Sequence, residues 1–191
     1  MYPAMALLET ESIPLGTPCP DFDLPGVDDR NHRRDDFADA DVLVVMFICN
    51  HCPYVVAIED RLVALARHFA GRSVQFVAIC SNDPEDYPAD NFENMTKRAI
   101  QKGYPFPYLQ DLSQQVARNF RAVCTPDLFV YGPDRGLAYH GRLDDNWQLP
   151  SQVTRQDLKD AIDTLLAGNN PSPEQVPSMG CSIKWRERRV P

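Results

Sequence analysis

The sequence predicts an α/β fold, and two observations carry this prediction. First, two apolar runs of strand length occur at Val42–Ile48 and Val74–Cys80, as expected for buried strands. Second, apolar residues between these runs recur at the three- and four-residue steps of an amphipathic helix over 50–70, and Gly71 ends this helix. Strand, helix and strand in this order predict a βαβ unit with a parallel pair of strands.

The segment before this unit predicts a hairpin. Residues 1–14 are expected to form an N-terminal arm. The prolines of 18–26 favour an extended chain, since each biases the residue before it away from helix. Residues 28–31, Asp-Asp-Arg-Asn, are typical of a hairpin tip.

The segment after this unit predicts further helices and strands in alternation. We expect one domain over 1–191, which ends in a C-terminal tail at 169–191. The predicted elements are a helix at 91–102 before Gly103, a proline-rich extended segment at 104–109, a helix at 113–120, strands at 127–131 and 137–142, and a helix at 152–167 before Gly168.

Composition limits the class of function. The 191 residues carry a net charge of −8, which argues against nucleic acid or an anionic membrane as the main partner. The N-terminus lacks the basic region of a secretory signal, so we expect a cytoplasmic protein. In that compartment the six cysteines should be mostly thiols, and any disulfide should be catalytic or transient.

Cys49 and Cys52 form a C-x-x-C motif between the first strand and the helix. We expect the Cys49 sulfur to lie beside unpaired helix N–H groups, which favour the thiolate that disulfide exchange requires. His51 adds a second positive charge if it is protonated. A disulfide across so short a loop gains little from restricting the unfolded chain, so it suits redox cycling better than stapling.

Two alternatives remain open for this motif. The cysteines could be an inert, half-buried pair. They could also bind zinc, which prefers four ligands, but the chain has no second C-x-x-C, and Cys80 and Cys124 would complete a site only if the fold brought them close. We therefore expect neither a metal nor a cofactor.

Three strings carry a family resemblance: Cys49-Asn-His-Cys-Pro-Tyr-Val, Cys124-Thr-Pro-Asp and Gly180-Cys-Ser-Ile-Lys-Trp. They resemble one uncharacterised peroxiredoxin-like subgroup, and the order of elements over 15–167 resembles the thioredoxin fold. Leu15-Gly-Thr-Pro-Cys-Pro-Asp-Phe is similar to the opening of its peroxiredoxin branch, the alkyl hydroperoxide reductase and thiol-specific antioxidant proteins. The expected architecture is a central mixed sheet flanked by helices, with an N-terminal hairpin extension and a C-terminal tail.

The resemblance also implies roles for individual residues. Cys49 would attack a substrate disulfide, Cys52 would resolve the mixed disulfide, and His51 would stabilise the thiolate. Thr125 and Pro126 would form the cis-proline loop that faces the redox pair and binds an extended substrate segment. Two further cysteines, Cys124 and Cys181, would serve as auxiliary thiols.

The peroxiredoxin branch implies a second hypothesis, a thiol-dependent antioxidant peroxidase. Its motif, P-x-x-x-[ST]-x-x-C, aligns the peroxidatic cysteine with Cys52, but Val45 and Cys49 replace the proline and the hydroxyl residue that help to position peroxide. The favoured function is therefore a thiol–disulfide oxidoreductase. Its partners would be protein or small-molecule disulfides or dithiols and a thiol reductant, with peroxide in the alternative. A third hypothesis is a non-catalytic module that binds a partner in the same groove.

Overall fold

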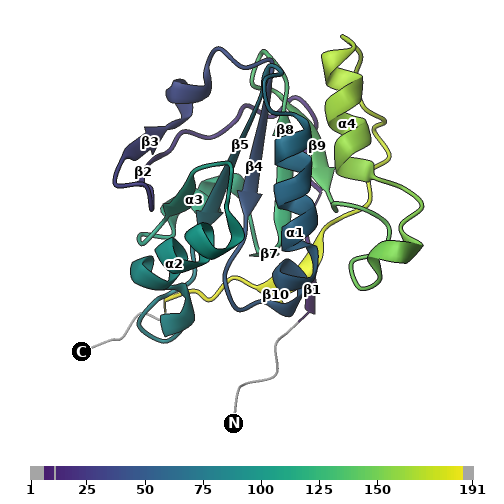
Figure 1. The fold of residues 1–191 in the computed structure, drawn as a ribbon. Coiled ribbons are helices and arrows are strands. Elements are labelled where there is room, and N and C mark those ends of the chain that lie inside the picture. Colours follow the sequence, from purple (N-terminus) through teal and green to yellow (C-terminus); the bar gives the residue numbers. More distant parts are fainter. Residues whose placement is uncertain (1–6, 11, 187–191) are drawn as a thin grey trace.

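A five-stranded mixed sheet forms the centre of the protein (Figure 1). The structure is a computed structural model that describes residues 7–10 and 12–186. The strand order is β6-β5-β4-β8-β9; β4 pairs in parallel with β5 and antiparallel with β8. The strands are β4 (Val42–Phe47), β5 (Val74–Cys80), β6 (Tyr108–Gln110), β8 (Asp127–Tyr131) and β9 (Leu137–Gly141). This arrangement confirms the predicted α/β architecture.

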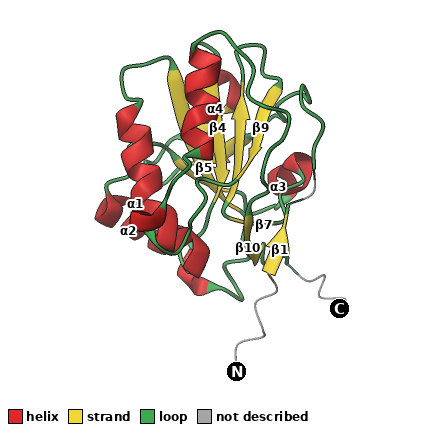
Figure 2. Ribbon diagram, turned by 90° about the vertical axis from the view of Figure 1, so that its right-hand side faces the viewer, coloured by secondary structure: helices red, strands yellow, loops and turns green. Residues whose placement is uncertain are grey.

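Helices cover both faces of the sheet, and Figure 2 shows α1 and α3 on opposite sides. Because side chains of β4 alternate between the two faces, Val44 packs in a cluster with residues of α1 and α4, whereas Val45 packs in a second cluster with residues of α3. Both faces are thus apolar, which explains the unbroken apolar run in the sequence. The helices are α1 (Pro53–His68), α2 (Phe92–Lys102), α3 (Gln115–Phe120) and α4 (Asp157–Leu166), with short 3-10 turns η1 (Arg34–Phe37), η2 (Pro88–Asp90) and η3 (Pro150–Gln152).

The start of α1 corrects the predicted helix at 50–70. The helix begins at Pro53, and Cys52 is its N-cap with φ −69° and ψ 123°. Proline is well suited to the first helical position, and it biases the residue before it towards an extended conformation. Cys49 and His51 therefore precede the helix instead of opening it.

The predicted hairpin extension is present. Strands β2 (Asp23–Pro25) and β3 (Asn31–Arg33) pair antiparallel around the turn at 26–30. Leu24 of this hairpin is buried in the same cluster as the α3 residues. The hairpin thus covers the face of the sheet that carries α3.

Parts of the predicted N-terminal arm and C-terminal tail pair with the body of the protein in a second sheet. Strands β1 (Leu7–Glu9), β10 (Met179–Ser182) and β7 (Cys124–Thr125) form a second sheet in the order β1-β10-β7. Open strand edges carry unpaired N–H and C=O groups, and here segments from both ends of the chain satisfy them. Such long-range pairing leaves no local signal in the sequence. The parts of the predicted arm and tail at 1–6, 11 and 187–191 lie outside the described residues.

Residues after β10 hold the tail against the body. Ile183 is buried in the cluster that contains α3 residues. The Lys184 N–H donates a 2.8 Å hydrogen bond to the Asn82 side chain, and Arg186 forms a 3.3 Å ion pair with buried Asp83. The segment at 182–186 is therefore an integral part of the fold.

Within the described part of the chain, no helix combines the length and the apolar character needed to cross a membrane.

Candidate active site

The C-x-x-C motif lies between β4 and α1, and both cysteines are buried. Cys49 is 3% exposed and Cys52 is fully buried. Because Cys52 caps α1, it is Cys52, and not Cys49 as expected, that lies beside the unpaired N–H groups and the positive end of the helix.

The loop at Thr125 and Pro126 faces both sulfurs. The Thr125–Pro126 peptide bond is cis, which confirms the predicted conformation. Cys49 Sγ lies 3.3 Å from the Thr125 hydroxyl oxygen, and the Cys52 thiol donates a 3.1 Å hydrogen bond to the Thr125 carbonyl oxygen. Thr125 therefore contacts the two thiols with two different groups.

The two thiols differ in acidity, in the order opposite to our expectation. A hydrogen bond from the Cys49 thiol lowers the pKa of Cys52 to about 5, and the Cys181 thiol and the Val55 N–H act in the same direction. Burial of Cys52 opposes this shift because it disfavours the charged thiolate, but the hydrogen bonds outweigh it. Burial raises the pKa of Cys49 well above the usual range of a thiol. The first proton lost from this pair thus leaves Cys52.

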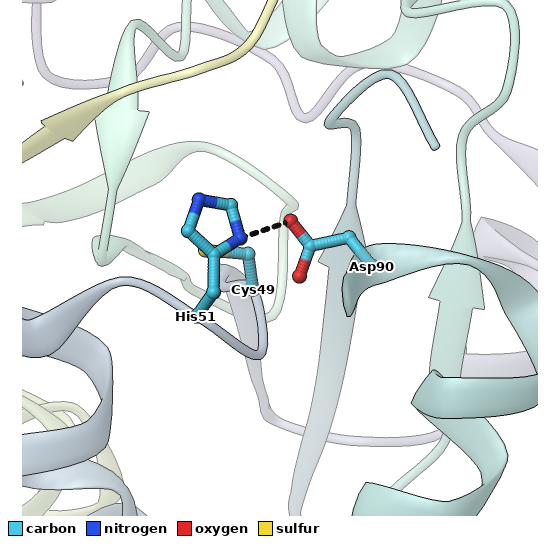
Figure 3. A group of neighbouring side chains, drawn as sticks. All are labelled: Cys49, His51 and Asp90. Carbon is cyan, nitrogen blue, oxygen red and sulfur yellow. Dashed lines mark ion pairs between the residues drawn. The ribbon is translucent and has the colours of Figure 1, made fainter. Parts of the chain in front are cut away.

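His51 is held by a buried carboxylate (Figure 3). Its Nδ1 lies 2.7 Å from Asp90 Oδ2, and its ring stacks on Tyr87 with centroids 5.5 Å apart. The Asp90 carboxylate raises the pKa of His51, and the neighbouring Cys52 contributes in the same direction. The imidazolium form is therefore favoured, and its charge in turn favours the Cys52 thiolate.

Sequence analysis missed Asp90, which is fully buried in η2. It accepts 2.7 Å hydrogen bonds from the Asn50 N–H and from the Asn82 side chain. These donors satisfy the hydrogen-bonding capacity of the buried carboxylate and aim it at His51. No local pattern marks such a residue, because its partners come from two other loops.

The same group of side chains is the one place in the described residues where His, Cys, Asp and Glu could hold a metal ion. The ligand atoms of Cys49, His51 and Asp90 lie within 4.8 Å of one another. Structural zinc sites have four protein ligands, and both Asp90 oxygens already accept hydrogen bonds. We therefore assign these groups to the orientation of His51.

The auxiliary cysteines differ in their positions. Cys181 Sγ lies 2.9 Å from Cys52 Sγ, so the structure brings this cysteine into direct contact with the C-x-x-C motif. Cys124 is fully buried, and its thiol donates to the Pro126 carbonyl oxygen at 3.7 Å. Burial raises the pKa of Cys124 far above the usual range, which disfavours a reactive thiolate at this position.

A pocket of about 210 Å³ adjoins the cis-proline loop. Its wall includes Pro126, Arg142 and the aromatic pair Tyr54–Trp147, whose ring centroids lie 4.3 Å apart. The pocket thus offers apolar surface beside Pro126, and its charged lining consists of Arg142 and the acidic residues Glu9, Asp144 and Asp145.

With this geometry in view, comparison with known families identifies the chain. The model of the AhpC/TSA family matches residues 15–140. The chain belongs to the AhpC/TSA family. This result agrees with the predicted peroxiredoxin-like resemblance, and it assigns to this AhpC/TSA protein a thiol-based redox activity in general. No curated protein matches the chain.

Three solved structures similar to this AhpC/TSA chain cover two ranges of sequence identity. An uncharacterised conserved protein from Geobacillus kaustophilus is 44% identical, with a TM-score of 0.90 over 96% of this chain and 98% of that one. A hypothetical protein from Sinorhizobium meliloti 1021 is 42% identical, with a TM-score of 0.89 over 93% and 98%. At lower identity, a thiol:disulfide interchange protein from Chlorobium tepidum shares the fold, at 18% identity and a TM-score of 0.57 over 68% of this chain and 87% of that one.

Proposed function

We propose that the protein is a thiol–disulfide oxidoreductase whose redox pair is Cys49 and Cys52. The observation that carries the proposal is the convergence of both sulfurs on Thr125, at 3.3 and 3.1 Å, with a pKa of about 5 at Cys52. Disulfide exchange needs a thiolate and a second thiol within reach of it. This site offers both.

The acidity of the pair supports Cys52, in place of Cys49, as the attacking residue. The Cys52 thiolate attacks one sulfur of a disulfide R–S–S–R′, the S–S bond breaks, and R′–S⁻ leaves and takes a proton from solvent. Cys49 then loses its proton and attacks Cys52 Sγ, which releases R–S⁻. Two electrons have passed to the substrate, and a thiol reductant restores the Cys49–Cys52 disulfide to two thiols. The reverse sequence oxidises a dithiol.

The substrate class that we propose is low-molecular-weight disulfides. An extended protein segment would pair with the edge of β7 beside Pro126, but β10 already pairs with β7 along that edge. A small molecule needs no such edge, and the pocket beside Pro126 can hold its non-reacting part. For the same reason, a non-catalytic module that binds a partner in this groove gains little support.

Turnover with two substrates tests this function. With dithiothreitol as donor, the protein should reduce oxidised glutathione faster than it reduces insulin. Cys52→Ser should abolish the reaction and Cys49→Ser should slow it, whereas Cys19→Ser, which replaces a buried thiol in the cluster around α3, should leave the rate unchanged. The proposal fails if neither disulfide is reduced faster than by the donor alone.

A peroxidase is the second candidate, and the low pKa of Cys52 favours it. Cys52 is the residue that aligns with the peroxidatic cysteine. Its thiolate would attack the O–O bond of a peroxide and become a sulfenic acid, while the leaving oxygen takes a proton; condensation with the Cys49 thiol would then release water and form the Cys49–Cys52 disulfide. Rapid peroxide consumption without reduction of oxidised glutathione would favour this candidate over the first.

A further inference from the structure

The C-terminal strand β10 occupies the edge of β7 on which a substrate segment was expected. Cys181 is in register with Thr125, and Ser182 is in register with Cys124. The chain thus supplies its own extended segment to the cis-proline loop, in the manner of strand addition to a sheet edge. This segment carries a cysteine at the position nearest the redox pair.

The backbone of β10 packs closely against the cis-proline loop at Gly180. A β-carbon on Gly180 would lie 2.6 Å from the carbonyl carbon of Thr125 and 3.1 Å from Pro126 Cδ. Only glycine lets the backbone of β10 come so near to the loop. The close approach brings Cys181 Sγ to 2.9 Å from Cys52 Sγ, where the two thiols hydrogen-bond. A disulfide needs a separation of about 2.05 Å, so a small side-chain adjustment is enough to form one.

We propose that Cys181 is a third redox thiol of the active site, which forms a disulfide with Cys52 and ties the C-terminal strand across the groove beside the cis-proline loop. This inference rests on the proposed disulfide exchange at Cys52. It adds a residue that the Cys49–Cys52 cycle does not use, and it makes Cys52 the central sulfur of a three-thiol site.

The chemistry balances with a low-molecular-weight disulfide as the oxidant. Oxidised glutathione reacts with the Cys52 thiolate, leaving glutathione bound to Cys52 through a disulfide and releasing one reduced glutathione. Cys181 then gives up its proton and attacks Cys52 Sγ. The second glutathione leaves and takes up that proton, so two cysteines are oxidised and one glutathione disulfide is reduced to two thiols.

The environment of Cys181 changes during this sequence. Burial raises the pKa of Cys181 to about 12, and both the hydrogen bond with Cys52 and the charge of Cys52 add to the shift, whereas Lys184 lowers it. The two contributions from Cys52 end when Cys52 enters a mixed disulfide and loses its charge. Cys181 then becomes more acidic at the step in which it must attack, and its position next to Cys52 supplies the proximity.

The anchoring of the tail keeps Cys181 in place for this step. Three backbone or side-chain contacts hold the residues after β10: Ile183 N–H with the Val123 carbonyl at 2.9 Å, Lys184 N–H with Asn82, and Arg186 N–H with the Gln114 side chain at 2.8 Å. Disulfide formation therefore needs no large movement of the tail.

Peptide mapping of the full-length protein tests the inference. Cleavage after lysine and arginine leaves Cys49 and Cys52 on the peptide 35–61 and Cys181 on the peptide 160–184. After treatment with oxidised glutathione and without reductant, part of the wild-type protein should yield these two peptides linked, because Cys181 competes with Cys49 for Cys52. Cys49→Ser should yield the same link, Cys181→Ser should lose it, and Cys19→Ser should keep it.

The double variant Cys49→Ser/Cys181→Ser tests disulfide exchange at Cys52 separately from the role of Cys181. It should retain glutathione on Cys52, because it lacks both of the thiols that we propose to displace it. If the double variant takes up no glutathione, the proposed function fails. If it takes up glutathione, but Cys49→Ser keeps the adduct as well and no link to the peptide 160–184 forms, then Cys181 is passive and this inference alone is overturned.

Discussion

Gly180 lies against Thr125 so closely that a β-carbon on Gly180 would overlap the Thr125 carbonyl group, 2.6 Å from its carbon. This contact joins the C-terminal strand to the cis-proline loop. Gly180 directly precedes Cys181, and Thr125 contacts Cys49 and Cys52. Replacing the glycine is therefore a direct way to separate the tail from the site.

We expect Gly180→Ala to lower the free energy of unfolding by about 1–3 kcal/mol, the usual cost of inserting a methyl group into a packed position. The backbone of β10 must move, which weakens its pairing with β7. Denaturant unfolding measures the first effect, and faster hydrogen exchange at the amides of 179–182 measures the second. Ser172→Ala, at an exposed position earlier in the same segment, should change neither quantity.

The thiolate of Cys52 should persist to acid pH. Its pKa of about 5 lies below that of an ordinary thiol, about 8.5, so the thiolate dominates above pH 5 and is lost as the pH falls through 5. Ultraviolet thiolate absorbance, followed during an acid titration, should show a transition near that pH. Cys52→Ser should remove the transition and Cys19→Ser should not; a transition that survives in Cys52→Ser would assign the thiolate to another residue.

Asp90→Asn should lower the pKa of His51, because the substitution removes the carboxylate that raises it. The ion pair with Asp90 stabilises the fold fully below the pKa of an unfolded histidine, and this contribution disappears as the pH rises through the higher folded value. NMR titration of the His51 ring measures the shift directly. The control is His68 in the same variant, and an unchanged His51 titration would contradict the role that we assign to Asp90.

Peroxide consumption should be slow in the wild-type protein and should depend on the group at position 49. Cys49→Thr introduces the hydroxyl that the peroxiredoxin motif carries at this position, whereas Cys49→Ala introduces no polar group. Since a positioned peroxide reacts faster with the Cys52 thiolate, we expect Cys49→Thr to consume peroxide faster than Cys49→Ala. Equal rates in the two variants would mean that the hydroxyl has no positioning role in this site.

The secondary structure of the centre could be predicted because its signals are local. Mostly apolar runs predict the strands at 74–80 and 127–131, whose bounds agree with β5 and β8. The helix after the redox motif was expected too early, and the reason was visible in the sequence. Pro53 favours the first helical position and holds Cys52 in an extended conformation, and this single residue moves the helix terminus from Cys49 to Cys52.

The sequence by itself determined the α/β architecture, the motif that holds Cys49 and Cys52, and the cis-proline loop next to it, because each depends on residues close together in the chain or on a specific motif. Only the tertiary structure decided which sulfur carries the charge, which carboxylate holds His51, and that Cys181 meets Cys52. These properties arise from burial and from contacts between distant segments: Asp90 reaches His51 from η2, and β10 reaches Thr125 from the other end of the chain. The pKa of each thiol depends on how deeply it is buried and on distances of a few ångström to groups from other segments. The periodicity and spacing of residues in the sequence do not specify these distances.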